Sequence, residues 1–259
     1  MKTTLVLSRQ HAFSLVELSI VLVILGLLVG GVLSGQSLIR AAELRSASTE
    51  YSRFTTAIGT FRDKYFALPG DMNNAVSFWL NVDTGNGDGD GLIESTATAI
   101  GASGALTSNE ISNFWIHLAK AGLVEGSYTA IANTTLTAGT NNPRARLNNA
   151  AWNVGTLGTV LNTSTTYFEG TYGNVFYFGS GTAAATPGAV LKPEEAGNMD
   201  TKMDDGRPHT GTVTSLESQG LTAGTACSSI TAAATTLAAS TYSLSNSSSS
   251  CSLVLKTGY

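Results

Sequence analysis

The sequence is poor in charged residues, in cysteine and in proline, and each shortage limits what the chain can be. Charged residues make up only 12% of its 259 residues, while Gly, Ser, Thr and Ala are abundant. We interpret this composition as that of a protein outside the cytoplasm rather than of a cytosolic enzyme. From Tyr65 onward there are seven basic and fourteen acidic residues, a net charge of −7. Because nucleic-acid binding needs Lys and Arg against phosphates, we expect no nucleic-acid partner.

The sequence also lacks the local motifs of common enzyme classes. It contains no HExxH zinc motif, no Walker A loop and no GxSxG nucleophile elbow. Neither cysteine has a histidine partner that the sequence can assign. We therefore predict that the protein is not an enzyme. An anchored periplasmic hydrolase is the least favoured alternative, since it would require two carboxylates across a cleft, which a sequence cannot place.

Only two cysteines are present, Cys227 and Cys251, and neither belongs to a CxxC pair. Two thiols alone cannot complete a structural zinc site. In an exported chain the simplest interpretation is one disulfide between them. A bridge that closes a loop of this size stabilises a fold by roughly 3–4 kcal/mol in the chain-entropy model. The alternative is a pair of independent buried thiols.

A long apolar run near the N-terminus is the strongest signal in the sequence. Residues 1–12 contain Lys2 and Arg9 but no acid, which favours a cytoplasmic location for this end. Residues 13–33 then make about 31 Å of helix, enough to span a bilayer. No A-x-A cleavage site follows the run. We therefore expect the apolar segment to remain as a membrane anchor.

One carboxylate, Glu17, stands near the start of this apolar run. A charged group in a membrane helix is costly unless it reaches the interface or finds a partner of opposite charge. If the chain were cut before Phe13, a new amino group would lie four residues from Glu17, which is one helical turn. The amine and the carboxylate could then pair within one subunit or between two neighbouring copies.

The segment FSLVELSIVLVILGLLVGG closely resembles the N-terminal motif of type IV prepilins and of type II secretion pseudopilins. The resemblance implies that prepilin peptidase cuts between Ala12 and Phe13 and that the new N-terminal Phe13 is N-methylated. It implies that Glu17 guides assembly with other pilin or pseudopilin subunits. Ala12 stands where this family usually has Gly.

The same resemblance implies a location for the protein. Members of this family cross the bacterial inner membrane once, with the N-terminus in the cytoplasm and the larger part in the periplasm. After assembly the subunits form a periplasmic or extracellular filament. We expect the inner membrane, prepilin peptidase and other subunits to be the partners of this chain.

The helical pattern continues beyond the membrane segment. Its apolar residues recur at steps of three and four, at Tyr51, Phe54, Ile58, Phe61 and Tyr65. The dipeptide Pro69–Gly70 is a strong helix breaker, so the helix should end near Ala67. We therefore predict a leader over residues 1–12, a transmembrane and stalk helix over 13–67, and a globular domain over 68–259.

The remaining residues predict an α+β fold in which an antiparallel sheet packs on the amphipathic half of the long helix, the layout that pilins share. Helical patterns cover residues 109–124 and 192–206, and strand patterns cover 172–180 and 211–218. His117 is a lone histidine in the first of these helices. We interpret it as structural rather than catalytic.

A Gly/Asp-rich segment, NVDTGNGDGDGLIE over residues 81–94, offers the best candidate site for a metal. The alternating oxygens and the following glycine match the first half of a calcium loop. The position of the usual twelfth-residue Glu is occupied by Ala97, so the match to an EF-hand is incomplete. We predict a calcium site of another kind, formed by Asn86, Asp88, Asp90 and Glu94. The alternative is a flexible Gly/Asp turn without metal.

A second acidic segment, DTKMDDGRPHTG, places Asp200 and Asp204 one helical turn apart, with Asp205 beside them. Such a spacing could serve a metal or an interaction surface. We favour the simpler interpretation, a helix end followed by a turn.

Together these observations predict a structural subunit of a type IV pilus or of a type II secretion pseudopilus. The length of the chain favours a minor subunit over a major one. The alternative is a pilin-like adhesin or ligand-binding module on a membrane-anchored stalk. Its acidic surface, the candidate calcium loop and the Ser/Thr-rich C-terminal region would then serve binding.

Overall fold

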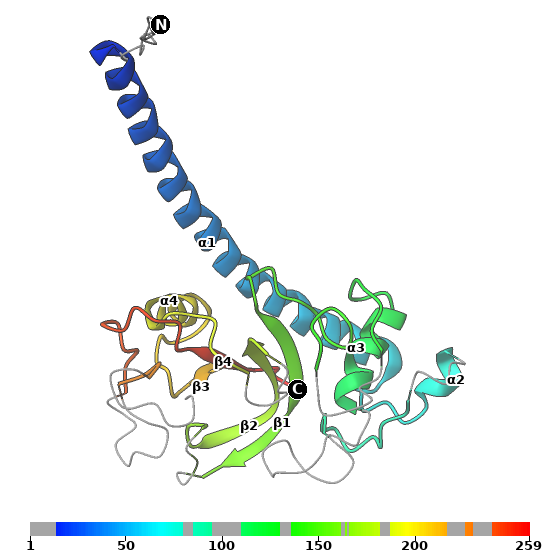
Figure 1. The fold of residues 1–259 in the computed structure, drawn as a ribbon. Helices are drawn as coiled ribbons and strands as arrows, with labels where there is room; N and C mark the ends of the chain where they lie inside the picture. Colours follow the sequence, from blue (N-terminus) through cyan, green and yellow to red (C-terminus); the bar gives the residue numbers. More distant parts are fainter. Residues whose placement is uncertain are drawn as a thin grey trace, which may run out of the picture. The chain divides into compact units, whose positions relative to one another are not determined.

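The computed structural model describes residues 14–79, 85–94, 110–129, 136–161, 164, 166–181, 187–216, 226–229 and 240–259. The chain divides into two compact units, residues 1–42 and 43–259, and each is described by itself (Figure 1). Helix α1 (Leu15–Tyr65) contributes residues to both units.

The described part of the first unit consists of the apolar part of α1. The large side chains from Leu15 to Leu33 are all at least half exposed, and Leu38 and Ile39 are exposed as well. Glu17 is the only charged residue between Leu15 and Ile39. The helix is long and apolar enough to cross a membrane, and no side chain of its apolar window is buried in the molecule.

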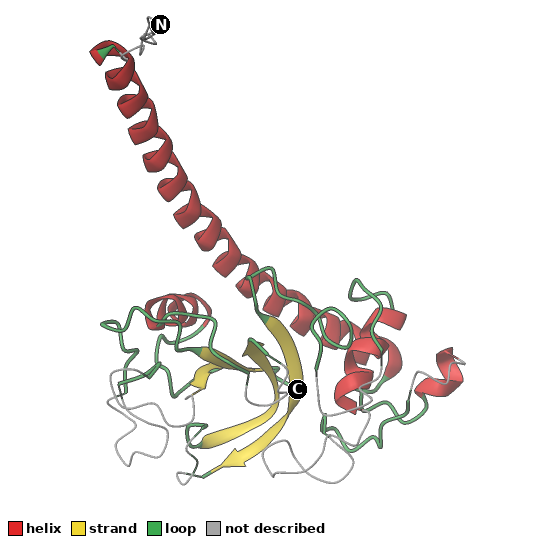
Figure 2. Cartoon of the chain, in the orientation of Figure 1, coloured by secondary structure: helices red, strands yellow, loops and turns green. Residues whose placement is uncertain are grey.

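The second unit is built on a four-stranded antiparallel sheet with the strand order β1-β2-β4-β3 (Figure 2). Its strands are β1 (Ala151–Val160), β2 (Gly170–Gly179), β3 (Val213–Leu216) and β4 (Ser252–Lys256). Alternate residues of the strands point to one face, on which the second half of α1 packs. The predicted α+β architecture, with a long helix on an antiparallel sheet, is confirmed.

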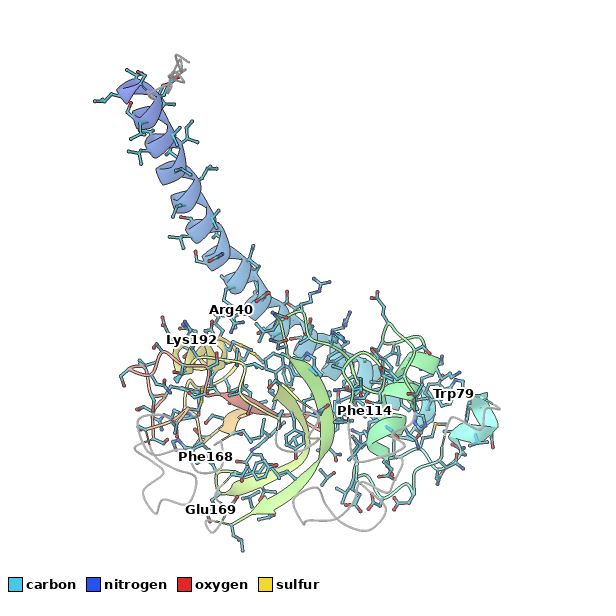
Figure 3. The ribbon with its side chains drawn as sticks, viewed as in Figure 1. Arg40, Trp79, Phe114, Phe168, Glu169 and Lys192 are labelled. Atoms are coloured by element: carbon cyan, nitrogen blue, oxygen red, sulfur yellow. A yellow bond between two sulfur atoms is a disulfide. The ribbon has the colours of Figure 1, made fainter. Side chains whose placement is uncertain are left out.

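Phe54 of α1 lies at the centre of the main core. Its ring centroid lies 5.7 Å from that of Trp152 in β1 and 6.0 Å from that of Phe176 in β2. On another side it contacts Trp115 at 5.0 Å. All four side chains are at most 1% exposed, and Phe114, which is labelled in Figure 3, is equally buried. Aromatic packing therefore joins α1 to both the sheet and the helix that carries Trp115 and Phe114.

The described residues form three shorter helices: α2 (Ala75–Trp79), α3 (Glu110–Lys120) and α4 (Pro193–Met203). α3 contacts β1 and α4 contacts β3, so the two helices lie at opposite edges of the sheet. α4 begins as the sequence predicts, with Pro193 in its first turn. The carboxylate of Glu195 accepts a hydrogen bond from the backbone N–H of Lys192 at 2.9 Å.

α1 ends at Tyr65, close to the predicted end near Ala67. The backbone N–H of Phe66 still donates to the carbonyl oxygen of Arg62 at 2.8 Å. Phe66 itself has a φ of 55°, a left-handed conformation that usually closes a helix at glycine. The chain then turns through Gly70, whose φ is 90°.

Candidate functional site

The N-terminus of α1 carries the predicted assembly residue, Glu17. Its carboxylate accepts a hydrogen bond from the backbone N–H of Ser14 at 2.8 Å. The hydroxyl of Ser14 in turn lies 3.4 Å from the backbone nitrogen of Val16. Glu17 thus supplies one half of a capping box by accepting from the N–H of the N-cap residue, while the Ser14 hydroxyl caps the second helical residue rather than the third.

The predicted cleavage residues, Ala12 and Phe13, lie outside the described residues. Ser14 is the first described residue, and its N–H points at Glu17. In a chain cut before Phe13, Ser14 would be the second residue. The carboxylate of Glu17 therefore reaches back to within one residue of the predicted new terminus.

The Gly/Asp loop, defined here as residues 85–94, uses its own polar side chains mostly for local structure. Asn86 accepts a hydrogen bond from the N–H of Val76 at 3.0 Å and so caps α2. Asp88 accepts from the N–H of Asp90 at 3.1 Å, and Asp90 accepts from the N–H of Leu92 at 2.8 Å. Such Asx turns shape a loop without metal.

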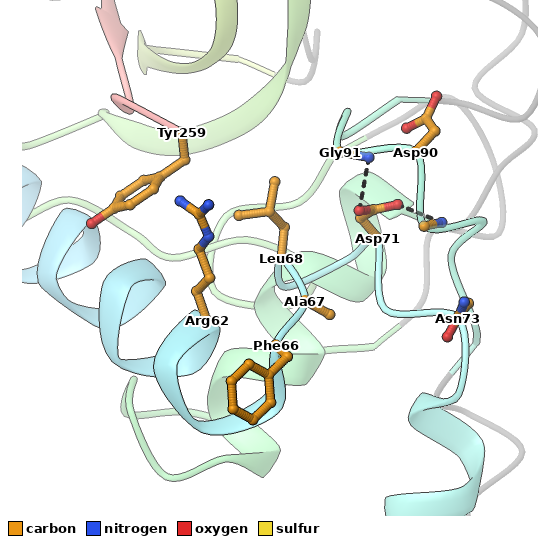
Figure 4. Close-up of a pocket in the computed structure, with 10 residues that line it drawn as sticks. Arg62, Phe66, Ala67, Leu68, Asp71, Asn73, Asp90, Gly91 and Tyr259 are labelled. Carbon is orange, nitrogen blue, oxygen red and sulfur yellow. Dashed lines mark hydrogen bonds between the residues drawn. The ribbon is translucent and has the colours of Figure 1, made fainter.

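Two carboxylates from outside the loop hold it in place, and the sequence prediction did not include them. The two oxygens of Asp71 accept from the N–H groups of Gly89 at 2.7 Å and Gly91 at 3.0 Å (Figure 4). The two oxygens of Glu110, at the start of α3, accept from the N–H groups of Asp88 and Glu94, both at 3.0 Å.

No local sequence signal marks these two carboxylates. Asp71 follows the Pro69–Gly70 turn, and Glu110 opens α3 far along the chain. Glu110 is an acid at the start of a helix, as many acids are, and Asp71 lies in a turn that no motif distinguishes.

The loop is also anchored at both ends. The N–H of Gly85 donates to Asn113 at 3.3 Å, and the N–H of Ile93 lies 2.9 Å from the side-chain oxygens of both Thr156 and Asn174. Asn174 donates in return to the carbonyl of Gly91 at 2.9 Å. Ile93 is 1% exposed and belongs to the main core. The loop is thus clamped between α3 and the sheet.

His117 is structural in this arrangement. Its Nδ1 accepts from the N–H of Gly70 at 2.9 Å, so Nε2 carries the proton and donates to the carbonyl of Gly85 at 3.1 Å. The ring stacks on Phe61 at 6.2 Å. Burial lowers the pKa of His117 to about 4, so the ring is neutral at physiological pH.

The carboxylates around the loop repel one another when they are ionised, which disfavours the ionised form of each. Burial raises the pKa of Glu110 to about 7, and the charges of Asp88 and Asp71 add to the shift, against the two N–H groups that Glu110 accepts. Burial also raises the pKa of Asp71 and of Glu94, with Asp90 and Asp88 contributing. A group of acids that repel one another in this way gains from a bound cation.

The geometry permits a cation within this group. Asp71, Asp88 and Glu110 each offer a carboxylate oxygen, and these oxygens lie within 4.8 Å of one another. Hard oxygen donors of this kind suit calcium or magnesium rather than zinc. Of the four predicted ligands, the structure thus brings Asp88 together with two acids that were not predicted.

The second acidic segment has hydrogen-bond partners for its carboxylates. Asp200 is fully buried and accepts from the Tyr242 hydroxyl at 2.8 Å and from the N–H of Gly206 at 3.2 Å. Asp205 accepts from the hydroxyl of Thr210 at 2.6 Å. Burial raises the pKa of Asp200 to about 7. These contacts agree with a helix end followed by a turn.

Cys227 and Cys251 form a disulfide, and both residues are fully buried. Cys251 directly precedes β4. Its backbone forms an isolated antiparallel β-bridge with Leu191, which lies just before α4. The disulfide therefore ties the segment around residue 227 to the sheet.

Comparison with known proteins identifies the N-terminal segment. Residues 7–33 match the family described as the prokaryotic N-terminal methylation motif. The chain thus carries the prepilin-type cleavage and methylation signal of type IV pilins and pseudopilins. No curated protein and no solved structure matches the chain. The motif and the fold together support a type IV pilin-like or pseudopilin-like protein.

Proposed function

We propose that the chain is a structural subunit, and a minor one, of a type IV pilus or of a type II secretion pseudopilus. The observation that carries the proposal is the methylation motif over residues 7–33. The motif overlaps the first part of α1, an apolar helix whose side chains are not buried within the molecule. The prepilin peptidase would be its processing partner, and other pilin or pseudopilin subunits its assembly partners. In this function the chain is not an enzyme.

Assembly would proceed through the apolar part of α1. Its side chains are exposed in the single subunit, so they require either lipid or the helices of other subunits around them. Before assembly the bacterial inner membrane supplies that environment, with residues 1–12 in the cytoplasm and the second unit in the periplasm. In the filament, neighbouring copies of α1 replace the lipid.

Glu17 would make this exchange selective. Cleavage before Phe13 releases a positive amino group, and the capping contact from Ser14 already directs the Glu17 carboxylate toward that end of the helix. A carboxylate buried among apolar helices is stable only beside a positive partner. The amine of a neighbouring subunit, or of the same subunit, meets this requirement.

The test is the incorporation of Glu17→Ala into filaments of the native host, with Ser19→Ala as the control. Ser19 lies in the same segment, carries no charge, and its hydroxyl donates to the carbonyl of Val16 in its own helix at 2.8 Å. We expect Glu17→Ala to be processed at Phe13 but to be lost from sheared filaments, while Ser19→Ala is incorporated normally. Normal incorporation of Glu17→Ala would rule out the pairing at Glu17.

We also propose that the Gly/Asp loop binds calcium in the folded second unit. The support is the convergence of Asp71, Asp88 and Glu110 and the upward shifts in the pKa of Glu110 and Asp71. Of the other predicted ligands, Asn86 and Glu94 lie in the same loop and would complete the oxygen shell, while Asp90 lines a cavity at the end of α1. Calcium would relieve the repulsion among these acids and would order the loop against α3.

A further inference from the structure

The end of α1 requires neither a phenylalanine at position 66 nor the exposure of its side chain. It occupies the left-handed position that closes α1, where a bulky residue is an outlier and glycine is the usual choice. Its side chain is 92% exposed, so burial in the subunit does not compensate for the strained backbone. Strain kept at an exposed aromatic residue indicates a contact with something outside the subunit.

A hollow lies beside Phe66, at the end of α1. It has a volume of about 420 Å³ and is lined by Phe66, Arg62, Leu68, Asn73, Asp90 and Tyr259, among others. Figure 4 shows Arg62 and Tyr259 on one side of the hollow and Asn73 and Asp90 on the other. The Arg62 guanidinium lies over the Tyr259 ring, 5.6 Å from its centroid. The exposed Phe66 side chain thus lies next to a cavity that has the positive charge of Arg62 on one side and the negative charge of Asp90 on the other.

We propose that this surface, which we call the Phe66 face, binds the Phe66 face of a second copy of the chain about a two-fold axis. In such an interface each surface is its own partner. Phe66 of each copy would enter the hollow of the other. Arg62 of each copy would meet Asp90 of the other, so the same ion pair would form twice. Exposed aromatic and Arg side chains are the residues that most often dominate such contacts.

This contact goes beyond the proposed function. A two-fold interface closes after two copies, so it cannot extend a filament. It would pair two subunits through their second units, and it involves no residue of the apolar part of α1. The two-fold pairing and the polymerisation through the apolar part of α1 can therefore be tested independently of each other.

Charge reversal tests the reciprocal ion pair in the full-length chain purified in detergent. In a dimer of the Arg62→Asp variant, the introduced carboxylate of each copy would face Asp90 of the other copy, and the two negative charges would repel. In a dimer of the Asp90→Arg variant, the introduced guanidinium group would face Arg62 of the other copy, and the two positive charges would repel. Each variant should therefore remain monomeric at about 10 µM, a concentration at which we expect the wild type to sediment as a dimer. A mixture of the two variants should form a heterodimer, because every contact then joins opposite charges.

Both reversals leave the apolar part of α1 unchanged, so association through that helix would be equal in all samples. Sedimentation velocity on the wild type, on each variant and on the mixture gives the answer. A monomeric wild type, or a mixture that associates no better than its components, overturns the proposal.

The variant Phe66→Gly separates binding from folding. Glycine relieves the left-handed strain, so the thermal midpoint should stay equal or rise, while the dissociation constant of the dimer should increase at least about tenfold. Leu244→Ala is the matched control, since Leu244 is a 70% exposed apolar residue that does not line the hollow. A drop in the stability of Phe66→Gly would mean that Phe66 serves the fold, and the proposal would lose its basis.

Discussion

The indole N–H of Trp152 donates a hydrogen bond to the carboxylate of Glu50 at 2.7 Å, although the two residues are 102 positions apart in sequence. The other oxygen of Glu50 accepts from the backbone N–H of Arg146 at 3.0 Å. Glu50 is 8% exposed and Trp152 is fully buried. One carboxylate on α1 therefore fixes both the start of β1 and the segment before it.

Replacement of this carboxylate should weaken the second unit. Glu50→Ala leaves the buried indole donor of Trp152 without a partner, and we expect a loss of at least about 2 kcal/mol in the free energy of unfolding. Thr49→Ala is the control, because Thr49 is exposed and its hydroxyl donates to the carbonyl of Arg45 within the same helix. Its effect should stay within about 0.5 kcal/mol. Denaturant titration followed by tryptophan fluorescence compares the two, and equal effects would contradict the assigned role of Glu50.

Gly70 should tolerate no side chain, for two separable reasons. It has a φ of 90°, and a Cβ there would lie 2.5 Å from the carbonyl oxygen of Glu110. Gly122 has a similar φ of 74° but open space around it, so Gly122→Ala measures the cost of the φ angle alone. That cost is about 1 kcal/mol. Gly70→Ala should cost at least about twice as much in thermal unfolding, and a smaller difference would mean that α3 shifts to accommodate the methyl group.

The raised pKa of Glu110 predicts a pH dependence of stability. Its folded pKa of about 7 lies above the ordinary value of 4.5, so the folded state binds the proton more tightly than the unfolded state. This contribution is fully present below about pH 4.5 and is lost as the pH rises through 7. Glu110→Gln does not titrate there. The stability advantage of the wild type over Glu110→Gln should therefore shrink between about pH 5 and pH 8 in the presence of a chelator.

His117 has the opposite dependence. Its pKa of about 4 lies below the ordinary 6.5, so its contribution is present above pH 6.5 and is lost as the pH falls toward 4. The wild type and the Glu110→Gln variant both contain His117, so the contribution of His117 cancels in the difference between their stabilities. A difference in stability that is constant with pH would show that Glu110 ionises normally in the folded chain.

Calcium should stabilise the wild type and not the ligand variants. At a concentration one hundred times the dissociation constant, a single site adds about 2.7 kcal/mol to the free energy of unfolding. Asp88→Asn and Glu110→Gln should each lose most of this gain in the thermal midpoint. Asp63→Asn, at an exposed acid on α1 outside both acidic groups, should keep it. An unchanged midpoint of the wild type in calcium and in chelator would exclude the site.

The helices of this protein could be predicted from sequence because their signals are local. The pattern from Tyr51 to Tyr65 and the break at Pro69–Gly70 placed the end of α1 within two residues. Pro193 and Gly206 likewise bracket α4, and α3 lies within the helical pattern predicted over residues 109–124. Strand β2 was predicted from its aromatic residues, which fill the core.

Features that depend on distant parts of the chain could not be predicted. Strand β1 contains Gly155 and Gly158 and shows no strict alternation, so only its pairing with β2 reveals it. Asp71 and Glu110 join the Gly/Asp loop through backbone N–H groups, which leave no trace in the sequence. The conformation of Phe66 was equally hidden, because the sequence offers a phenylalanine where a helix usually ends at glycine.

The central claim is that the chain is processed and assembled as a pilin-like subunit, and its N-terminal residue tests this most directly. Mass spectrometry of the protein recovered from membranes of the native host identifies that residue and its modification. The account predicts a chain that begins with N-methylated Phe13 and lacks residues 1–12. A chain that retains Met1 and carries no methyl group at Phe13 would contradict it, and would leave a membrane-anchored protein that does not enter the prepilin pathway.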